Sequence, residues 1–196
     1  MDEDRRERQP FGGAERERST SVKDKVVVFE VSGYSCGLPM EQVREIVPMC
    51  DLARPPGLPP LLEGFLNLRG EITPVLRMER LFGLSPIILR RHTQIIVLHG
   101  ETPLALLADE VRNVVSLGPD ELLPASDDSV FNDCVEGVLF TARAPVHVLR
   151  VDRLLLAQEK RRISEHQEIE HRRLMELEEA DAGGRSQPHA MTSTGN

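Results

Sequence analysis

Aromatic residues are scarce in this chain, and other features that would reveal a function directly are missing. None of its 196 residues is tryptophan, and Tyr34 is its one tyrosine, so there are few platforms for stacking nucleic-acid bases. The net charge of −8 also argues against nucleic-acid binding, which needs a basic surface to neutralise phosphates. No apolar run is long enough to span a bilayer, and the charged N-terminus lacks a signal-peptide core.

Cysteine and metal-binding motifs are equally sparse. The three cysteines, Cys36, Cys50 and Cys134, are odd in number and lack CxxC spacing, which favours buried thiols in a reducing cytoplasm. The glycines are scattered and none precedes Lys and then Ser or Thr, so the sequence has no phosphate loop. His92, His99 and His147 lack the i, i+4 spacing of a helical metal pair. We therefore predict no metal site and no cofactor.

The sequence of residues 63–84 predicts a strand, a tight turn, a second strand and a short helix. A short apolar run leads into Arg69-Gly70, where glycine suits a turn, and β-branched residues follow. Pro74 cannot donate a hydrogen bond to a ladder, so it indicates an edge strand. Apolar residues then recur at helical spacing up to Gly83, which can end a helix.

Several segments of the chain recur in the same order and at nearly the same offset. The recurrences pair residues 38–47 with 106–115, 63–66 with 136–139, and 75–82 with 148–155. Matches in register indicate an internal duplication. We therefore predict two similar lobes, at about residues 25–85 and 93–156.

The remaining segments are polar. Residues 1–24 predict a disordered leader, and residues 181–196 predict a disordered tail. A long charged helix is predicted from Val151 to about residue 180, and its part 158–180 is expected to project past the lobes, solvated or covering a partner. Short strands between closely spaced turns favour small β-barrels, whose closure removes exposed edges. We predict two small barrel lobes with a C-terminal helix.

The order of these motifs resembles the CheW-type chemotaxis coupling proteins, adaptors that join chemoreceptors to a CheA-type histidine kinase. The resemblance covers about residues 25–157. It is carried by GFLNLRG at 64–70, with support from VREI at 43–46 and VDRLL at 151–155. It implies a mainly β fold of two intertwined, five-stranded SH3-like barrels that share a core. It also implies a cytoplasmic adaptor without enzymatic activity, recruited to receptor arrays at the inner face of the membrane.

The resemblance also implies a partner surface for the kinase regulatory domain and the cytoplasmic tip of a methyl-accepting chemoreceptor. Its residues would be Val43, Glu45, Ile46, Gly64, Asn67, Arg69 and Gly70. A turn arginine such as Arg69 can fork onto a partner carboxylate, or it can be merely solvated. Glu45 would pair with a basic partner residue or simply face outward. The apolar pair Val43 and Ile46 would fill either the core or a partner groove, and the glycines would serve backbone geometry.

Three positions depart from the family pattern. Arg77 and Arg150 occupy equivalent places in the two repeats where the family usually has acidic residues, and Glu79 stands where a basic residue is common. We therefore predict that Arg77, Glu79 and Arg150 are specificity residues at the rim of the partner surface. The alternative is an altered surface ion pair with a small effect on stability.

Other hypotheses remain open. One is an enzyme that uses Cys134 or His147, although no basic residue is adjacent to Cys134 in sequence to activate its thiol. Another is a nucleic-acid-binding barrel, which the charge disfavours. Within the adaptor class, the alternative is a CheW-like scaffold whose pathway controls something other than motility.

Overall fold

The computed structural model describes residues 24–118, 121–125, 134–155 and 157–184, so the predicted leader (apart from Asp24) and the end of the predicted tail lie outside the described residues. In chain order the elements are β1 (Lys25–Val31), β2 (Tyr34–Pro39), a 3-10 turn (Met40–Gln42), β3 (Val43–Pro48), β4 (Leu62–Leu68), β5 (Glu71–Leu76), α1 (Met78–Leu81), β6 (Gln94–Leu98), β7 (Ala105–Ala108), β8 (Glu110–Ser116), β9 (Leu122–Leu123), β10 (Val135–Phe140), β11 (Pro145–Leu149), a 3-10 turn (Val151–Arg153) and α2 (Ala157–Gly184).

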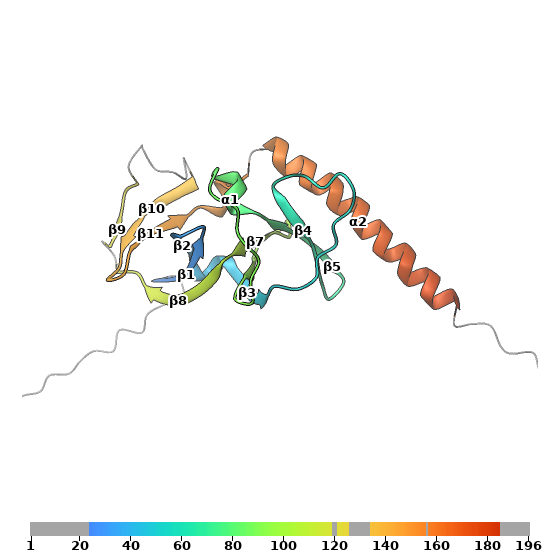
Figure 1. Ribbon diagram of the computed structural model, residues 1–196, viewed down its shortest axis with the longest axis horizontal. Helices are drawn as coiled ribbons and strands as arrows, with labels where there is room; N and C mark the ends of the chain where they lie inside the picture. Colours follow the sequence, from blue (N-terminus) through green and yellow to red (C-terminus); the bar gives the residue numbers. More distant parts are fainter. Residues whose placement is uncertain (1–23, 119–120, 126–133, 156, 185–196) are drawn as a thin grey trace, which may run out of the picture.

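The strands form two sheets that lie side by side, and α2 runs past β4 and β5 (Figure 1). One sheet has the order β8-β1-β2-β11-β10-β9, and the other has the order β3-β6-β7-β5-β4. The mainly β fold with two lobes and a C-terminal helix is thus confirmed. The first sheet has one strand more than the predicted five, because the short β9 pairs with Val138 and Leu139 of β10.

Two hairpins have two-residue turns with glycine at the second position. Ser32 and Gly33 join β1 to β2 with φ values of 50° and 85°, and Arg69 and Gly70 join β4 to β5 with 56° and 89°. Positive φ at both central positions is the type I′ geometry, whose twist matches that of the flanking strands. These turns fix the register of both hairpins.

The internal duplication is visible in the strand pairing. Val75 of β5 pairs in parallel with Ala105 of β7, and Val148 of β11 pairs in parallel with Gly37 of β2. Val75 and Val148 are equivalent in the two repeats. Each repeat also has a β-bulge at the same place, between Leu62 and Gly64 in β4 and between Val135 and Gly137 in β10.

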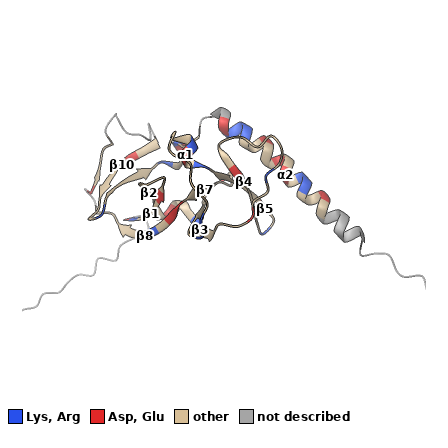
Figure 2. Cartoon of the chain, in the orientation of Figure 1, with Lys and Arg blue, Asp and Glu red and all other residues tan. Residues whose placement is uncertain are grey.

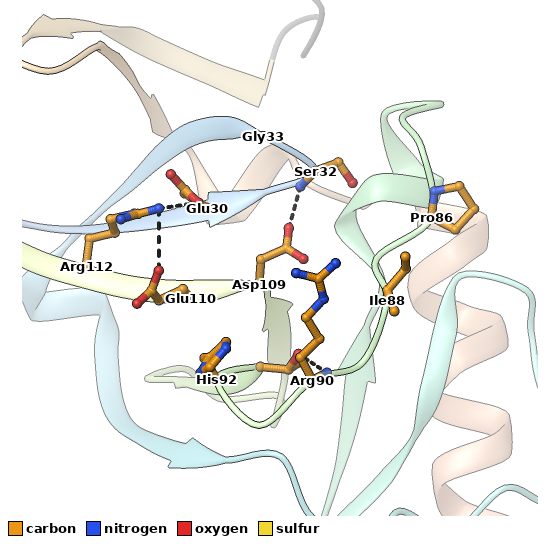
Figure 3. A pocket seen from close by; sticks show the side chains of 11 residues that line it. Glu30, Ser32, Gly33, Pro86, Ile88, Arg90, His92, Asp109, Glu110 and Arg112 are labelled. Carbon is orange, nitrogen blue, oxygen red and sulfur yellow. Dashed lines mark hydrogen bonds and ion pairs between the residues drawn. The ribbon is translucent and has the colours of Figure 1, made fainter.

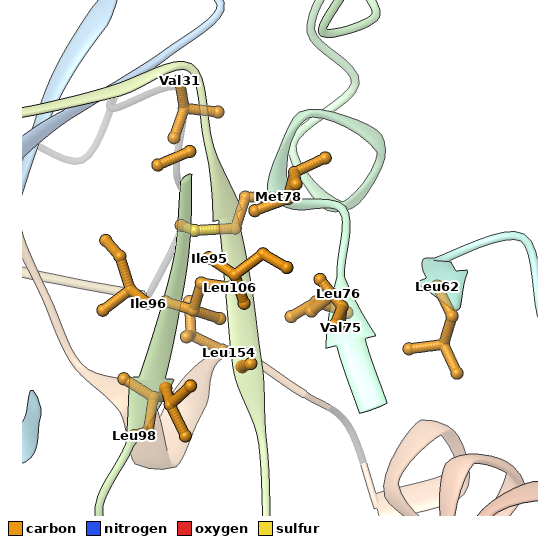
Figure 4. Packing of buried hydrophobic residues seen from close by; sticks show 14 of the residues in the cluster. Val31, Leu62, Val75, Leu76, Met78, Ile95, Ile96, Leu98, Leu106 and Leu154 are labelled. Carbon is orange, nitrogen blue, oxygen red and sulfur yellow. The ribbon is translucent and has the colours of Figure 1, made fainter. Parts of the chain in front are cut away.

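Each sheet takes strands from both repeats. The hairpin β1–β2 of the first repeat joins β8, β10 and β11 of the second, whereas the hairpin β6–β7 of the second joins β3, β4 and β5 of the first. The boundary between the repeats is therefore not the boundary between the sheets. Because strands are exchanged in this way, one hydrophobic cluster joins the two sheets. This central cluster contains Phe29 and Cys36 from one sheet and Ile95 and Leu106 from the other. Figure 4 shows Val31 packed in that cluster with residues of β6 and β7.

The C-terminal helix differs from its prediction in three respects. It continues to Gly184, so the prediction of a disordered tail is wrong for residues 181–184. It begins at Ala157, not at Val151, because residues 151–153 form a separate 3-10 turn held by burial of Leu154 and Leu155. It also does not simply project into solvent. Ile163 is only 4% exposed and belongs to the central cluster. The expectation of a free extension is therefore wrong for the first half of α2.

Candidate functional site

The predicted surface residues of β3 face in different directions. Val43 is half-buried and packs against the central cluster, whereas Ile46 is 36% exposed. Glu45 is half-buried and accepts a hydrogen bond of 3.3 Å from Nε of its neighbour Arg44. Val43 thus belongs to the core edge, and Ile46 supplies the apolar surface.

The turn between β4 and β5 is exposed and is closed by a side-chain hydrogen bond. Oδ1 of Asn67 accepts a hydrogen bond of 2.9 Å from the backbone N–H of Gly70, which closes the turn. Arg69 and Gly70 are both exposed. Within the described residues, the guanidinium of Arg69 forms no hydrogen bond or ion pair with another side chain. Among the described residues, the turn therefore presents an unpaired guanidinium on a backbone that Asn67 closes.

An ion pair joins β3 to this turn. Nη1 of Arg44 lies 2.6 Å from Oε2 of Glu71, the first residue of β5, and this hydrogen bond raises the pKa of Arg44 above its ordinary value. The ion pair links the exposed face of β3 to the start of β5, with Ile46 two residues after Arg44 and Arg69 two residues before Glu71. We call the surface formed by β3 and the Asn67–Gly70 turn the β3–turn surface.

Gly64 has a different place from the other predicted partner residues. It is buried in β4, and a Cβ atom there would lie 2.7 Å from Cβ of Leu52 and 2.8 Å from the carbonyl oxygen of Ala53. The segment around Ala53 pairs with Phe65 of β4. Glycine thus permits the loop 52–60 to lie directly on this strand.

Arg77 and Glu79 were expected at a rim, and this placement is wrong because both are buried, at 8% and 0% exposure. The guanidinium of Arg77 forms ion pairs with Glu79 and, at 2.6 Å, with Glu63, and it donates to the carbonyl oxygen of Ile87 at 3.2 Å. Arg54 completes the network from the loop 52–60, 2.6 Å from Glu63. Because Arg77 is buried, it could affect the choice of partner only indirectly, by fixing the positions of the loop 52–60 and α1.

Sequence reasoning missed Glu63 and Arg54 as members of this network. The one available signal was the recurrence of Glu63 as Glu136, but Glu136 is exposed. Arg150, the counterpart of Arg77, is half-exposed and lies 3.1 Å from Asp152, where its hydrogen bond lowers the pKa of that carboxyl. The two equivalent arginines therefore have different environments.

A charged cleft of about 350 Å³ lies where the β1–β2 turn meets β8 and the linker, which is the segment 85–91 between α1 and β6 (Figure 3). Arg112 bridges Glu30 and Glu110 at 2.8 and 3.4 Å, and Asp109 accepts a hydrogen bond of 2.6 Å from the N–H of Ser32. These contacts tie strands together. No group of acidic, histidine or cysteine side chains in the part of the chain that the structure describes is arranged to hold a metal ion.

The residues of the enzyme hypothesis are engaged with the backbone. Sγ of Cys134 donates to the carbonyl oxygen of Arg153 at 3.1 Å, and Nδ1 of His147 lies 3.3 Å from the carbonyl oxygen of Ser35.

Acidic and basic residues alternate along α2 (Figure 2). Among the described residues, no helix has the length and apolar character needed to cross a membrane.

Comparison with known proteins gives concordant results. Residues 25–159 match the CheW-like domain family. The chain is 28% identical to "Chemotaxis protein CheW" of Bacillus subtilis over 105 residues, covering 53% of this chain and 67% of that protein. It is 22% identical to the protein of the same name from Treponema pallidum over 147 residues, with 71% and 86% coverage. The crystal structure of the scaffolding protein TtCheW from Thermoanaerobacter tengcongensis has the same fold, with a TM-score of 0.65, 24% identity, and coverage of 71% and 92%.

Proposed function

Because this chain belongs to the CheW-like domain family of non-enzymatic adaptors in chemotaxis signalling, we propose that it couples chemoreceptors to a CheA-type histidine kinase. One observation carries the proposal. The Arg44–Glu71 ion pair joins β3 to the Asn67–Gly70 turn, so residues far apart in sequence form one exposed surface.

The chemistry of the β3–turn surface fits a protein partner. Ile46 offers an exposed apolar side chain, and Arg69 offers a guanidinium that is not used within the described part of the chain. Arginine is enriched at interface hot spots because its planar fork can bind a carboxylate or two carbonyl oxygens. The hydrogen bond from Gly70 to Asn67 holds the turn before binding, which lowers the entropic cost of association.

The proposed partners are the regulatory domain of the kinase and the cytoplasmic tip of a methyl-accepting chemoreceptor. The protein would then act in the cytoplasm, at receptor arrays on the inner face of the membrane. Glu45, beside Arg44, would contact a basic residue of a partner, and Val43 would support Ile46 from the core side.

The proposal is tested by titrating the full chain with the kinase regulatory domain and, separately, with the receptor tip. Arg69→Ala should weaken binding by about tenfold or more, the scale of a hot-spot residue, while the free energy of unfolding changes by no more than about 0.5 kcal/mol. Arg91→Ala is the matched control, because Arg91 is also an exposed arginine but lies in the linker. Equal affinities of wild type and Arg69→Ala for both partners would refute the assignment of this surface.

A further inference from the structure

We propose that α2 is a displaceable cover, which docks over the open edge of β5 and limits access of a partner to the β3–turn surface. The family match ends at residue 159, whereas α2 continues to Gly184, so nearly all of this helix is an addition to the shared domain. The inference rests on the proposed function, since it concerns the same surface.

The edge that α2 covers lies in the first half of β5. Leu68 and Glu71 flank the two-residue turn as a hydrogen-bonded pair, so the next pair, Asn67 and Ile72, directs its backbone groups away from the hairpin. On that side β7 pairs with β5 only at Val75 and Leu76. The carbonyl oxygen of Ile72 therefore faces none of the described strands.

A side chain of α2 takes the place of the absent strand. Nε2 of Gln167 donates a hydrogen bond of 2.6 Å to the carbonyl oxygen of Ile72. Nε2 of His166 lies 2.9 Å from the carbonyl oxygen of Gly57 in the loop 52–60, and as its N–H form it donates to that oxygen. Covering an open strand edge with a helix is a common protection against unwanted pairing.

Few apolar contacts hold the helix in this position. Ile163 is its one fully buried apolar side chain among those described, and Leu174 is half-buried. Ile169 and Met175 are each 46% exposed, and Leu177 is 68% exposed. Besides these apolar contacts, the described part of α2 is held by three hydrogen bonds to backbone carbonyls of the body, from Lys160, His166 and Gln167. A helix held by so few contacts can detach while the sheets stay folded.

The docked helix lies directly beside the proposed partner surface. Glu71, which binds Arg44, also lines a cavity of about 280 Å³ together with Gln167, Glu168 and His171. Arg69 and Gly70 immediately precede Glu71 in the chain. A partner domain that covers roughly 800 Å² of this protein would reach α2 when centred on the turn. Binding and docking of α2 therefore compete.

The test uses the full chain with the double substitution His166→Ala and Gln167→Ala, which removes the hydrogen bonds of α2 to the loop 52–60 and to β5. The matched control is Glu165→Ala with Arg172→Ala, two exposed residues of the same helix. Hydrogen exchange is measured over residues 52–60 and 71–76, and affinity for the kinase regulatory domain and the receptor tip is measured by calorimetry. The double variant should show faster exchange in both segments and about fivefold or greater tightening for at least one partner, the usual scale of coupling between sites.

Other results would overturn the inference. Unchanged exchange in the double variant would show that these hydrogen bonds do not hold α2. Faster exchange with weaker binding would make α2 part of the binding surface, and faster exchange with unchanged binding would make it irrelevant to partners. If no form of the chain binds either partner, the proposed function fails, and the exchange result alone decides whether α2 covers the β5 edge.

Discussion

Nη1 of Arg77 lies 2.6 Å from Oε2 of Glu63, and both side chains are almost completely enclosed. At the equivalent place in the second repeat, Arg150 pairs with Asp152 and Glu136 is exposed. The duplicated sequence thus holds one arginine as a buried cross-link between β4, α1 and the linker, and the other as a surface ion pair. The two differ in what they contribute to stability.

Arg77→Ala should lower the free energy of unfolding by about 3 kcal/mol, because it leaves Glu79 buried without its cation and leaves Glu63 paired with Arg54 alone. Arg150→Ala is the matched control and should cost less than about 1 kcal/mol. Urea denaturation of the three proteins gives the comparison. Charge reversal by Arg77→Asp would gather three buried carboxylates and should be worse than Arg77→Ala. Equal losses for Arg77→Ala and Arg150→Ala would show that the Arg77 network has no special role.

Ile163→Ala should destabilise the protein by about 2 kcal/mol, since it deletes the buried side chain that anchors α2. Leu177→Ala, in the exposed part of the same helix, should change stability by less than about 0.5 kcal/mol. Thermal unfolding of both variants measures the difference. If the two substitutions have the same small effect, α2 is not anchored by Ile163.

The reactivity of each cysteine should follow the exposure of its thiol. Burial raises the pKa of Cys36 to about 12 from an ordinary 9.0, so its reactive thiolate is suppressed in the native protein. The protonated thiol favours the folded state below the ordinary pKa, and this contribution is lost as the pH rises above it. Alkylation of native protein at about pH 8 should modify exposed Cys50 and spare Cys36, as read by peptide mass spectrometry. Rapid modification of Cys36 would contradict its buried position.

An isolated fragment 25–85 should not fold, because its β1–β2 hairpin needs β8 and β11 as neighbours. Mixing it with a fragment spanning 86–184 should restore a cooperative unfolding transition, seen by circular dichroism. A cooperative transition in fragment 25–85 alone would show that the exchanged strands are not required.

Local chemistry explains which parts of the fold were predictable. The Arg69-Gly70 and Ser32-Gly33 turns depend on adjacent residues, so the sequence alone predicts both hairpins. The repeat likewise predicts two similar lobes. It does not tell which hairpin joins which sheet, because the same pattern would suit a lobe that kept its own hairpin. That choice depends on pairings between segments far apart in the chain, such as Val148 with Gly37.

The features of the site that escaped prediction depend on distant contacts. Arg77 was expected at the rim of the partner surface because it departs from the family pattern, but its burial depends on Glu63, which also binds Arg54 of the loop 52–60. Ile163 stands among charged residues, so nothing nearby in sequence indicates that it reaches the core. The position of Arg69 on an exposed turn was predictable, whereas its link to β3 through Glu71 was not.

The most direct test of the account is whether this chain brings the kinase regulatory domain and the receptor tip into one complex. Sedimentation velocity of the three proteins together should show a species larger than any pair when wild type or Arg91→Ala is present. With Arg69→Ala that species should be depleted, while the protein itself remains folded. If the three proteins form no joint species, or if Arg69→Ala supports it as well as wild type, coupling through the β3–turn surface is contradicted.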